Sequence, residues 1–349
     1  MKALKILENR TGSNWEHLRI ARETSEEERV EITAKLENFP TADASIVVVG
    51  SLAREEFTPG SDIDWTLLLD GMSRPQDEQL ARDIRQALRE RKQPGPEGVF
   101  GTFVSSHDLI HRIGGESDTN ANTTRRILLL LESVAIGRPD AHSRVMNNIL
   151  YRYVEEDRGL WFGSNQSKVP RFLFNDVARY WRTMAVDFAY KQRTRPDGGF
   201  LLRNTKLRMS RKLLFLAGML LCFDCHTRFE SQDERREFYR GKPVEAVINR
   251  LREVLIHPPL EILAEALLAY PSYDCSIKQL FTAYDEFVGM LADEAKREHL
   301  NTLHVDQIDG DSVAGEARDI SHRFRDAISD LFLTKETELG RLTLEYGVF

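Results

Sequence analysis

The segment Val49–Trp65, with the sequence VGSLAREEFTPGSDIDW, joins two apolar runs through a Gly-Ser step and an Asp-x-Asp step. The apolar runs predict two consecutive strands. Residues i and i+2 of a strand point to the same face of a sheet, so Asp62 and Asp64 are expected to project two carboxylates side by side. Two neighbouring carboxylates need a compensating cation to stay ionised together. We therefore predict a site for Mg²⁺, or Mn²⁺, bound together with substrate phosphates.

The residues between the two runs favour the same chemistry. Gly50 allows the backbone to come close to a ligand. Ser51 and Ser61 offer hydroxyl groups, and a short helical turn from Leu52 would direct N–H groups without intrahelical partners at a phosphate. The stretch is therefore predicted to hold the phosphates of a nucleotide beside the two carboxylates. The alternative is a solvated strand end next to an ordinary turn.

These residues resemble the signature of the DNA polymerase β-like nucleotidyltransferase superfamily, which combines Gly-Ser, a spacer and Asp-x-Asp on a strand. The segment is similar, more closely, to the PII-protein uridylyltransferases and the nucleotidyltransferases related to them. They share Gly-x-x-x-Arg-x-Glu followed by Ser-Asp-Ile-Asp, which Gly50, Arg54, Glu56 and residues 61–64 reproduce at the same spacing. The resemblance covers roughly residues 44–137. It implies nucleotide binding by this loop, with Arg54 either contacting phosphate or pairing with Glu56.

A third carboxylate is generally used in two-metal phosphoryl transfer. The expected strand for it, residues 99–105, contains no acid. In the uridylyltransferases such a strand is followed by an Asp-x-Thr-x-x-Thr-like segment and a Leu-rich helix, which residues 115–133 resemble. This resemblance implies Asp118 as the third catalytic acid, with Asp108 and Glu116 as further candidates. An Asp before a helix is also an ordinary N-terminal cap. If none of them serves, activity is degenerate or a substrate group acts instead.

A basic stretch lies far along the chain, at residues 202–212, where five basic residues fall within ten positions. In the superfamily a helix of the second domain commonly supplies Lys or Arg to the nucleotide triphosphate. The resemblance therefore gives four further nucleotide-binding candidates: Lys206, Arg208, Arg211 and Lys212. A solvated basic helix face is the alternative.

The pattern of elements predicts an α+β fold, with a small mixed-sheet nucleotidyltransferase core followed by an all-helical domain. Two helices are expected before residue 40, the second beginning at a capping box at Ser25 and ending at Pro40. The expected strands are residues 44–49, 62–69 and 99–105. Helices are expected at 74–91, 107–113, 122–134, 142–156, 171–193, 205–223, 243–256, 260–270, 277–303 and 316–336. We place the catalytic domain at 1–140 and the helical domain at 141–349.

Composition limits the class of protein. The chain has 349 residues and a net charge of −7, so stable DNA binding is not expected. The longest apolar run, residues 213–223, is too short to span a bilayer, and the N-terminus has no signal-peptide pattern, so we expect a cytoplasmic protein. Cys222–His226 spells a c-type haem attachment pattern, but that chemistry needs an exported chain. No second ligand pair for zinc accompanies it.

The predicted reaction is transfer of a nucleoside monophosphate from a nucleoside triphosphate to an acceptor hydroxyl, with release of pyrophosphate. The uridylyltransferase resemblance favours a protein side chain as acceptor. A nucleotide second-messenger synthase and a small-molecule (antibiotic) nucleotidyltransferase are alternatives with other acceptors. A catalytically inactive nucleotide-binding module is a third alternative, because the third strand lacks its acid.

Overall fold

The computed structural model describes residues 2–39, 43–94, 100–162, 167–194 and 199–347. By their contacts the residues group into two compact units. The sheet unit comprises residues 21–158 and 243–258, and the helical unit comprises residues 1–20, 159–242 and 259–349. The domain division at residue 140 stays a prediction, because compactness does not establish which segments fold by themselves.

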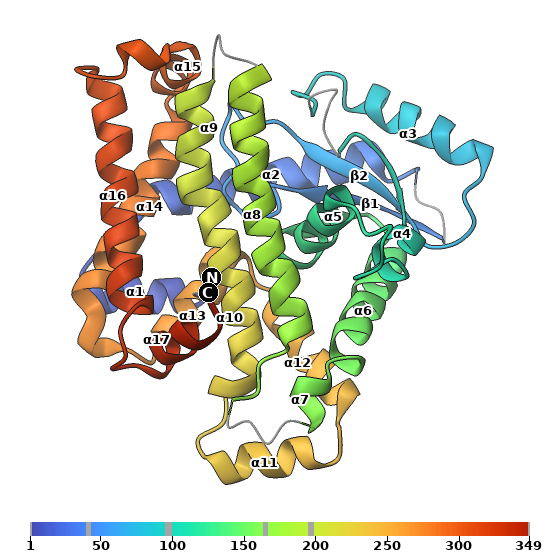
Figure 1. Ribbon diagram of the computed structural model, residues 1–349. Helices are drawn as coiled ribbons and strands as arrows, with labels where there is room; N and C mark the ends of the chain where they lie inside the picture. Colours follow the sequence, from blue (N-terminus) through green and yellow to red (C-terminus); the bar gives the residue numbers. More distant parts are fainter. Residues whose placement is uncertain (1, 40–42, 95–99, 163–166, 195–198, 348–349) are drawn as a thin grey trace. The chain divides into compact units, whose positions relative to one another are not determined.

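The sheet unit is built on four strands. β1 (Ala44–Val49) lies between β2 (Asp64–Leu69) and β4 (Ser133–Ile136) and is antiparallel to both, and β3 (Thr102–Ser105) pairs in parallel with β2. β1 and β2 lie side by side in Figure 1. The register pairs Val49 with both Asp64 and Ser133. The end of β1, where Gly50 follows, therefore meets the first residue of β2.

The two faces of this sheet differ. One face carries a hydrophobic core to which alternate strand residues contribute, together with residues of α2 (Glu16–Leu36) and α3 (Pro75–Ala87); its strand members are Ala44, Ile46, Val48, Trp65, Leu67, Leu69 and Ile136. Directly opposite residues of an antiparallel pair share a face, so Asp64, opposite Val49, projects from the other face. α6 (Asp140–Glu155) packs on that second face, where the His142 N–H donates to Ser45 Oγ at 3.1 Å.

The remaining helices divide between the units. The sheet unit also contains α4 (Ser106–Ile110), α5 (Asn120–Leu131) and α12 (Val244–Leu255), which packs against α6. The helical unit has α14 packed along α16, and α10 packed against α8 and α13 (Figure 1). Its helices are α1 (Lys2–Thr11), α7 (Arg158–Phe162), α8 (Arg171–Thr194), α9 (Phe200–Lys206), α10 (Lys212–Thr227), α11 (Gln232–Arg240), α13 (Pro259–Leu267), α14 (Asp274–Ala292), α15 (Glu294–Thr302), α16 (Ser312–Phe332) and α17 (Glu338–Leu342), with short turns η1 (Leu207–Arg211), η2 (Pro271–Tyr273), η3 (Val305–Gln307) and η4 (Thr343–Gly347).

The predicted α+β class is confirmed: a small mixed sheet near the N-terminus is followed by a helical region. The predicted third strand appears as β3, and its first residue lies outside the described residues, as does Pro40. Within the described ranges, no helix has the combination of length and apolarity that crossing a bilayer requires.

Several predicted elements were wrong in detail. The strand expected over 62–69 begins at Asp64, so Asp62 precedes β2. The helix expected to begin at Ser25 begins at Glu16, because nothing in this stretch breaks it and the Ser25 hydroxyl donates to Ala21 O at 2.6 Å inside the helix. Residues 133–134, expected at the end of a helix, belong to the unexpected strand β4, which pairs with β1. The helix expected over 277–303 is two helices, because Asp293 leaves the helical conformation and caps α15 through the Lys296 N–H.

Candidate active site

Gly50 and Asp64 are in direct contact at the end of β1. Gly50 has a φ of +75°, a conformation that favours glycine. A Cβ atom at this position would lie 3.1 Å from Asp64 Oδ2, so a larger residue would have to displace the carboxylate or the turn by a few tenths of an ångström. The Gly-Ser step and the Asp-x-Asp step therefore meet in space, as the sequence predicts.

The chain after Gly50 forms a tight turn. Gly50 O accepts from the Arg54 N–H at 2.9 Å, and Ser51 O accepts from the Glu56 N–H at 2.8 Å. In such a helical turn the first N–H groups have no partner within the turn. Ser51 is partly exposed, whereas Leu52 and Ala53 are buried. Donation by this turn to a phosphate group, as at helix N-termini and nests, stays a prediction.

A second turn precedes the Asp-x-Asp step. The Ser61 N–H donates to Thr58 O at 2.8 Å, and Ser61 Oγ accepts from the Thr58 N–H at 3.2 Å. The two hydroxyl groups lie 3.0 Å apart. Ser61 therefore braces the connection that leads into Asp62; direct binding of nucleotide by its hydroxyl stays a prediction.

Asp62 and Asp64 flank Ile63, whose side chain is buried in the core. Both aspartates are partly exposed, and Asp64 lies at the end of β2, opposite Val49. Among the described residues, no group of three or more His, Cys, Asp or Glu is arranged to hold a metal ion. Two carboxylates beside a phosphate-binding turn fit Mg²⁺, which is typically held by one or two carboxylates with phosphates and water completing its shell. The donor set therefore suits a metal that arrives with a nucleotide.

Arg54 points into the protein. Its Nε lies 2.9 Å from Glu56 Oε2, and its Nη1 contacts Glu132 Oε2. The three side chains are buried, with the Arg54 side chain 7% exposed. Of the two roles considered for Arg54, the structure shows the ion pair with Glu56 and adds Glu132, the residue between α5 and β4, as a second partner.

The turn is also attached to α2. Glu55, at a φ of +63°, places its carboxylate 3.3 Å from Arg22 and 3.4 Å from Arg29. Ser25 Oγ accepts from the Phe57 N–H at 3.0 Å. The hydroxyl that was predicted to cap a helix therefore fixes the end of the turn instead.

A comparison with protein-family models gave one match, the nucleotidyltransferase domain, over residues 30–97. The chain carries a nucleotidyltransferase domain. This agrees with the predicted membership of the DNA polymerase β-like superfamily. The matched segment includes Gly50, Ser51, Asp62 and Asp64 and ends before Asp118. Neither the curated proteins nor the solved structures include a protein that matches this chain.

The Asp118 carboxylate is bound by residues of the sheet unit. Its Oδ1 accepts from Arg126 Nη1 at 3.2 Å, and its Oδ2 accepts from Arg126 Nη2 at 2.9 Å and from the Gly114 N–H at 3.2 Å. The side chains of Asp118 and Arg126 are 1% and 0% exposed, and Arg126 Nε donates to the Tyr153 hydroxyl at 2.6 Å. Binding a metal would require this carboxylate to leave its guanidinium. This pairing favours a structural role for Asp118, and its role as the third acid stays a prediction.

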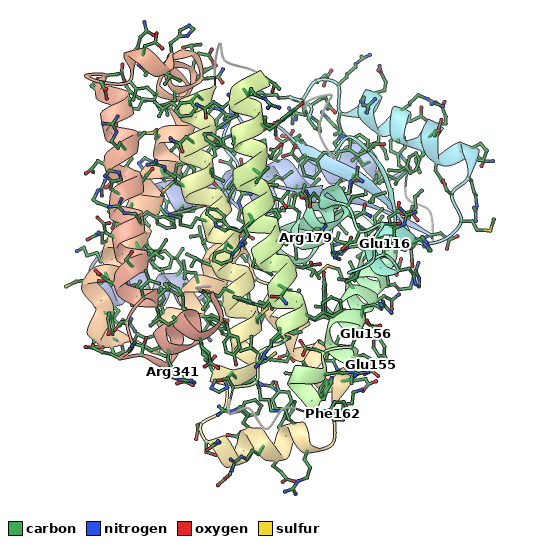
Figure 2. The ribbon with its side chains drawn as sticks, in the orientation of Figure 1. Glu116, Glu155, Glu156, Phe162, Arg179 and Arg341 are labelled. Carbon is green, nitrogen blue, oxygen red and sulfur yellow. The ribbon has the colours of Figure 1, made fainter. Side chains whose placement is uncertain are left out.

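The other two candidates for the third acid lie close to Asp118 in sequence. Asp108 Oδ1 lies 3.1 Å from Arg112 Nε on the surface of α4. Glu116 is exposed in the connection between α4 and α5 (Figure 2). Neither residue belongs to a metal-binding group among the described side chains. The catalytic roles of Asp108 and Glu116 stay predictions.

A structural role for Asp118 predicts a change in stability rather than in catalysis. Asp118→Asn removes the charged partner of a buried guanidinium, which is expected to lower the free energy of unfolding by about 3 kcal/mol. Chemical denaturation of the purified variant measures this loss. The folded fraction, assayed at low temperature, is expected to keep its kcat. A variant with unchanged stability and no turnover would instead identify Asp118 as the third acid.

The start of β4 is held by a Ser–His pair. Ser133 Oγ donates to Leu129 O at 2.5 Å and lies 2.7 Å from His142 Nε2. Since the hydroxyl proton is used for Leu129, the imidazole donates through Nε2. Burial lowers the pKa of His142 to about 4, so its imidazole is neutral at physiological pH. This pair fixes the first residue of β4, next to Glu132.

The four basic candidates belong to the helical unit. Lys206 ends α9, Arg208 and Arg211 lie in the π-helical turn η1, and Lys212 begins α10. Burial lowers the pKa of Lys212, and the nearby charges of Arg208 and Arg325 lower it further. Cations gathered at this density attract an anion. Their role in binding the nucleotide stays a prediction.

The cysteine motif of α10 has a structural explanation. Cys222 and Cys225 are buried. His226 Nδ1 accepts from the Lys168 N–H at 3.1 Å, and its Nε2 lies 2.6 Å from Glu338 Oε1. Both ring nitrogens of His226 are thus engaged within the helical unit, which joins α10 to α17.

Proposed function

We propose that this protein transfers a nucleoside monophosphate from a nucleoside triphosphate to an acceptor hydroxyl and releases pyrophosphate. The observation that carries the proposal is the closeness of Gly50 to the Asp64 carboxylate. It supports a site in which the Gly50–Leu52 turn binds phosphate next to Asp62 and Asp64. The nucleotidyltransferase domain over residues 30–97 supports the same class of reaction.

Each residue of this site has a proposed task. Asp62 and Asp64 hold Mg²⁺ or Mn²⁺. The backbone N–H groups of the Gly50–Leu52 turn and the Ser51 hydroxyl bind the β- and γ-phosphates, which fixes the α-phosphate beside the carboxylates. When bound, the metal neutralises charge that develops on the phosphate oxygens. The acceptor oxygen then displaces pyrophosphate at the α-phosphorus. Lys206, Arg208, Arg211 and Lys212 are proposed as additional phosphate ligands.

The acceptor is proposed to be a hydroxyl of a protein side chain. The support is the similarity of Gly50, Arg54, Glu56 and residues 61–64 to the uridylyltransferase pattern. Fold-level similarity is a weak guide to substrates, so the acceptor has to be found by experiment. The finding that no three-ligand group occurs among the described residues favours one other candidate, an inactive nucleotide-binding module.

Incubation with each labelled nucleoside triphosphate and Mg²⁺ or Mn²⁺ separates these functions. We expect label on protein. A soluble cyclic or linear oligonucleotide would point to a second-messenger synthase, and a labelled small molecule to an antibiotic-type transferase. Tight nucleotide binding without turnover under all conditions would contradict the proposed reaction and support the inactive module.

A further inference from the structure

Arg54 is enclosed too completely to meet a substrate. Its guanidinium lies between Glu56 and Glu132, whose side chains are 3% and 1% exposed. A guanidinium presents a planar fork of donors, which can serve two carboxylates at once in a fixed geometry. The Arg of the Gly-x-x-x-Arg-x-Glu pattern therefore acts within the protein, and Glu132 is the partner that the pattern does not contain.

The Arg54–Glu132 ion pair links two segments of the sheet unit because of where Glu132 lies in the fold. Glu132 immediately precedes Ser133, and Ser133 pairs with Val49, the residue before Gly50. The ion pair thus joins the turn that follows β1 to the segment that precedes β4. In the described sheet β4 is an edge strand of four residues, held by β1 and by the Ser133–His142 contact. Through its ion pair with Arg54, Glu132 therefore holds the turn from the β4 side of the sheet.

The turn itself needs such external support. Glu55 has a φ of +63°, a conformation that costs a non-glycine residue free energy and persists where the surroundings impose it. Arg22 and Arg29 hold Glu55 from α2, and Arg54 is held from the side of β4. The phosphate-binding turn is therefore anchored on two sides by charged contacts.

We infer that Glu132 is a positioning residue for nucleotide transfer. Through Arg54 it holds the Gly50–Ser51 turn in the conformation that directs the backbone N–H groups at the phosphates. This inference rests on the proposed function of the turn. Under this inference catalysis depends on Glu132, a residue 78 positions after Arg54. It also implies that Arg54 contributes to nucleotide affinity without touching the nucleotide.

The test is Glu132→Gln with a matched control. Glutamine keeps the shape of the side chain and removes the charge. The control is Glu28→Gln, because Arg91 contacts Glu28 and Glu31 as Arg54 contacts Glu56 and Glu132, in a cluster that is more exposed. We expect Glu132→Gln to raise KM for the nucleotide or lower kcat by about 10- to 100-fold in total. Amide hydrogen exchange of residues 50–57 is expected to become faster in the same variant.

The control and a second variant separate positioning from general stability. Glu28→Gln is expected to leave both kinetic constants and exchange at residues 50–57 unchanged. Arg54→Lys keeps the charge but loses the fork, so it is expected to behave like Glu132→Gln. If Glu132→Gln had wild-type exchange and wild-type kcat/KM, the inference would be overturned while the proposed function stood. If the wild-type protein transferred no nucleotide, the proposed function would fail, and the exchange data would still decide whether Glu132 orders the turn.

Discussion

The double variant Asp62→Ala/Asp64→Ala is expected to lose nucleotide transfer by roughly a thousand-fold or more. A bound metal contributes several kcal/mol to stabilisation of the transition-state charge, and each 1.36 kcal/mol corresponds to a factor of ten in rate. Asp64 lies next to Gly50, and Asp62 precedes Asp64 by two residues. Removing both therefore removes the predicted metal ligands and leaves the turn that is proposed to bind phosphate in place.

The same variant makes a second measurement possible. In the absence of metal, two neighbouring carboxylates repel each other, so their removal is expected to leave the thermal midpoint unchanged or slightly higher. Mg²⁺ with a nucleoside triphosphate is expected to raise the midpoint of the wild type and not of the variant. Asp83→Ala, on the exposed surface of α3, serves as the control with normal activity. Undiminished transfer in the double variant would mean that the site has been placed wrongly.

The parts of the fold that could be predicted from the sequence depend on local patterns. The apolar runs before Gly50 and after Asp64 specify β1 and β2, and the α+β class follows from them. The strand β4 could not be predicted, because Ser133–Ile136 is short and follows directly on a Leu-rich helix. Its strand conformation depends on pairing with β1, more than 80 residues earlier. Pairing at such separation leaves no periodic signal in the sequence.

The candidate site divides in the same way. The closeness of Gly50 and Asp64 could be predicted from the sequence, because these residues lie at the adjoining ends of two consecutive strands that pair in antiparallel. Glu132 could not, since its contact with Arg54 joins residues separated by 78 positions. Ser25 carried a misleading signal: the residues around it fit a capping box, while its hydroxyl is used inside α2 and by the Phe57 N–H. The segment around Asp118 resembles the uridylyltransferase pattern. That resemblance does not indicate that the Arg126 guanidinium donates to the Asp118 carboxylate.

Among substitutions that add a single methyl group, Gly50→Ala is expected to have the largest effect on the activity of this site. An alanine at a φ of +75° costs about 1–2 kcal/mol of backbone strain. Its Cβ would also lie 3.1 Å from Asp64 Oδ2, so the carboxylate or the turn must shift by a few tenths of an ångström. Misplacement of a metal ligand and a phosphate-binding turn together is expected to lower kcat/KM by about 10- to 100-fold. Steady-state kinetics with the preferred nucleotide measures this loss.

Gly12→Ala isolates the contribution of the close contact. Gly12 has a φ of +59°, comparable with that of Gly50, but a Cβ there meets nothing within 4 Å. Both variants therefore carry a similar backbone strain, and they differ in whether the new methyl group meets a carboxylate. If strain alone mattered, both would lose similar stability and keep the same kcat/KM. A selective loss of transfer in Gly50→Ala would show that the distance between this backbone and Asp64 is part of the catalytic geometry.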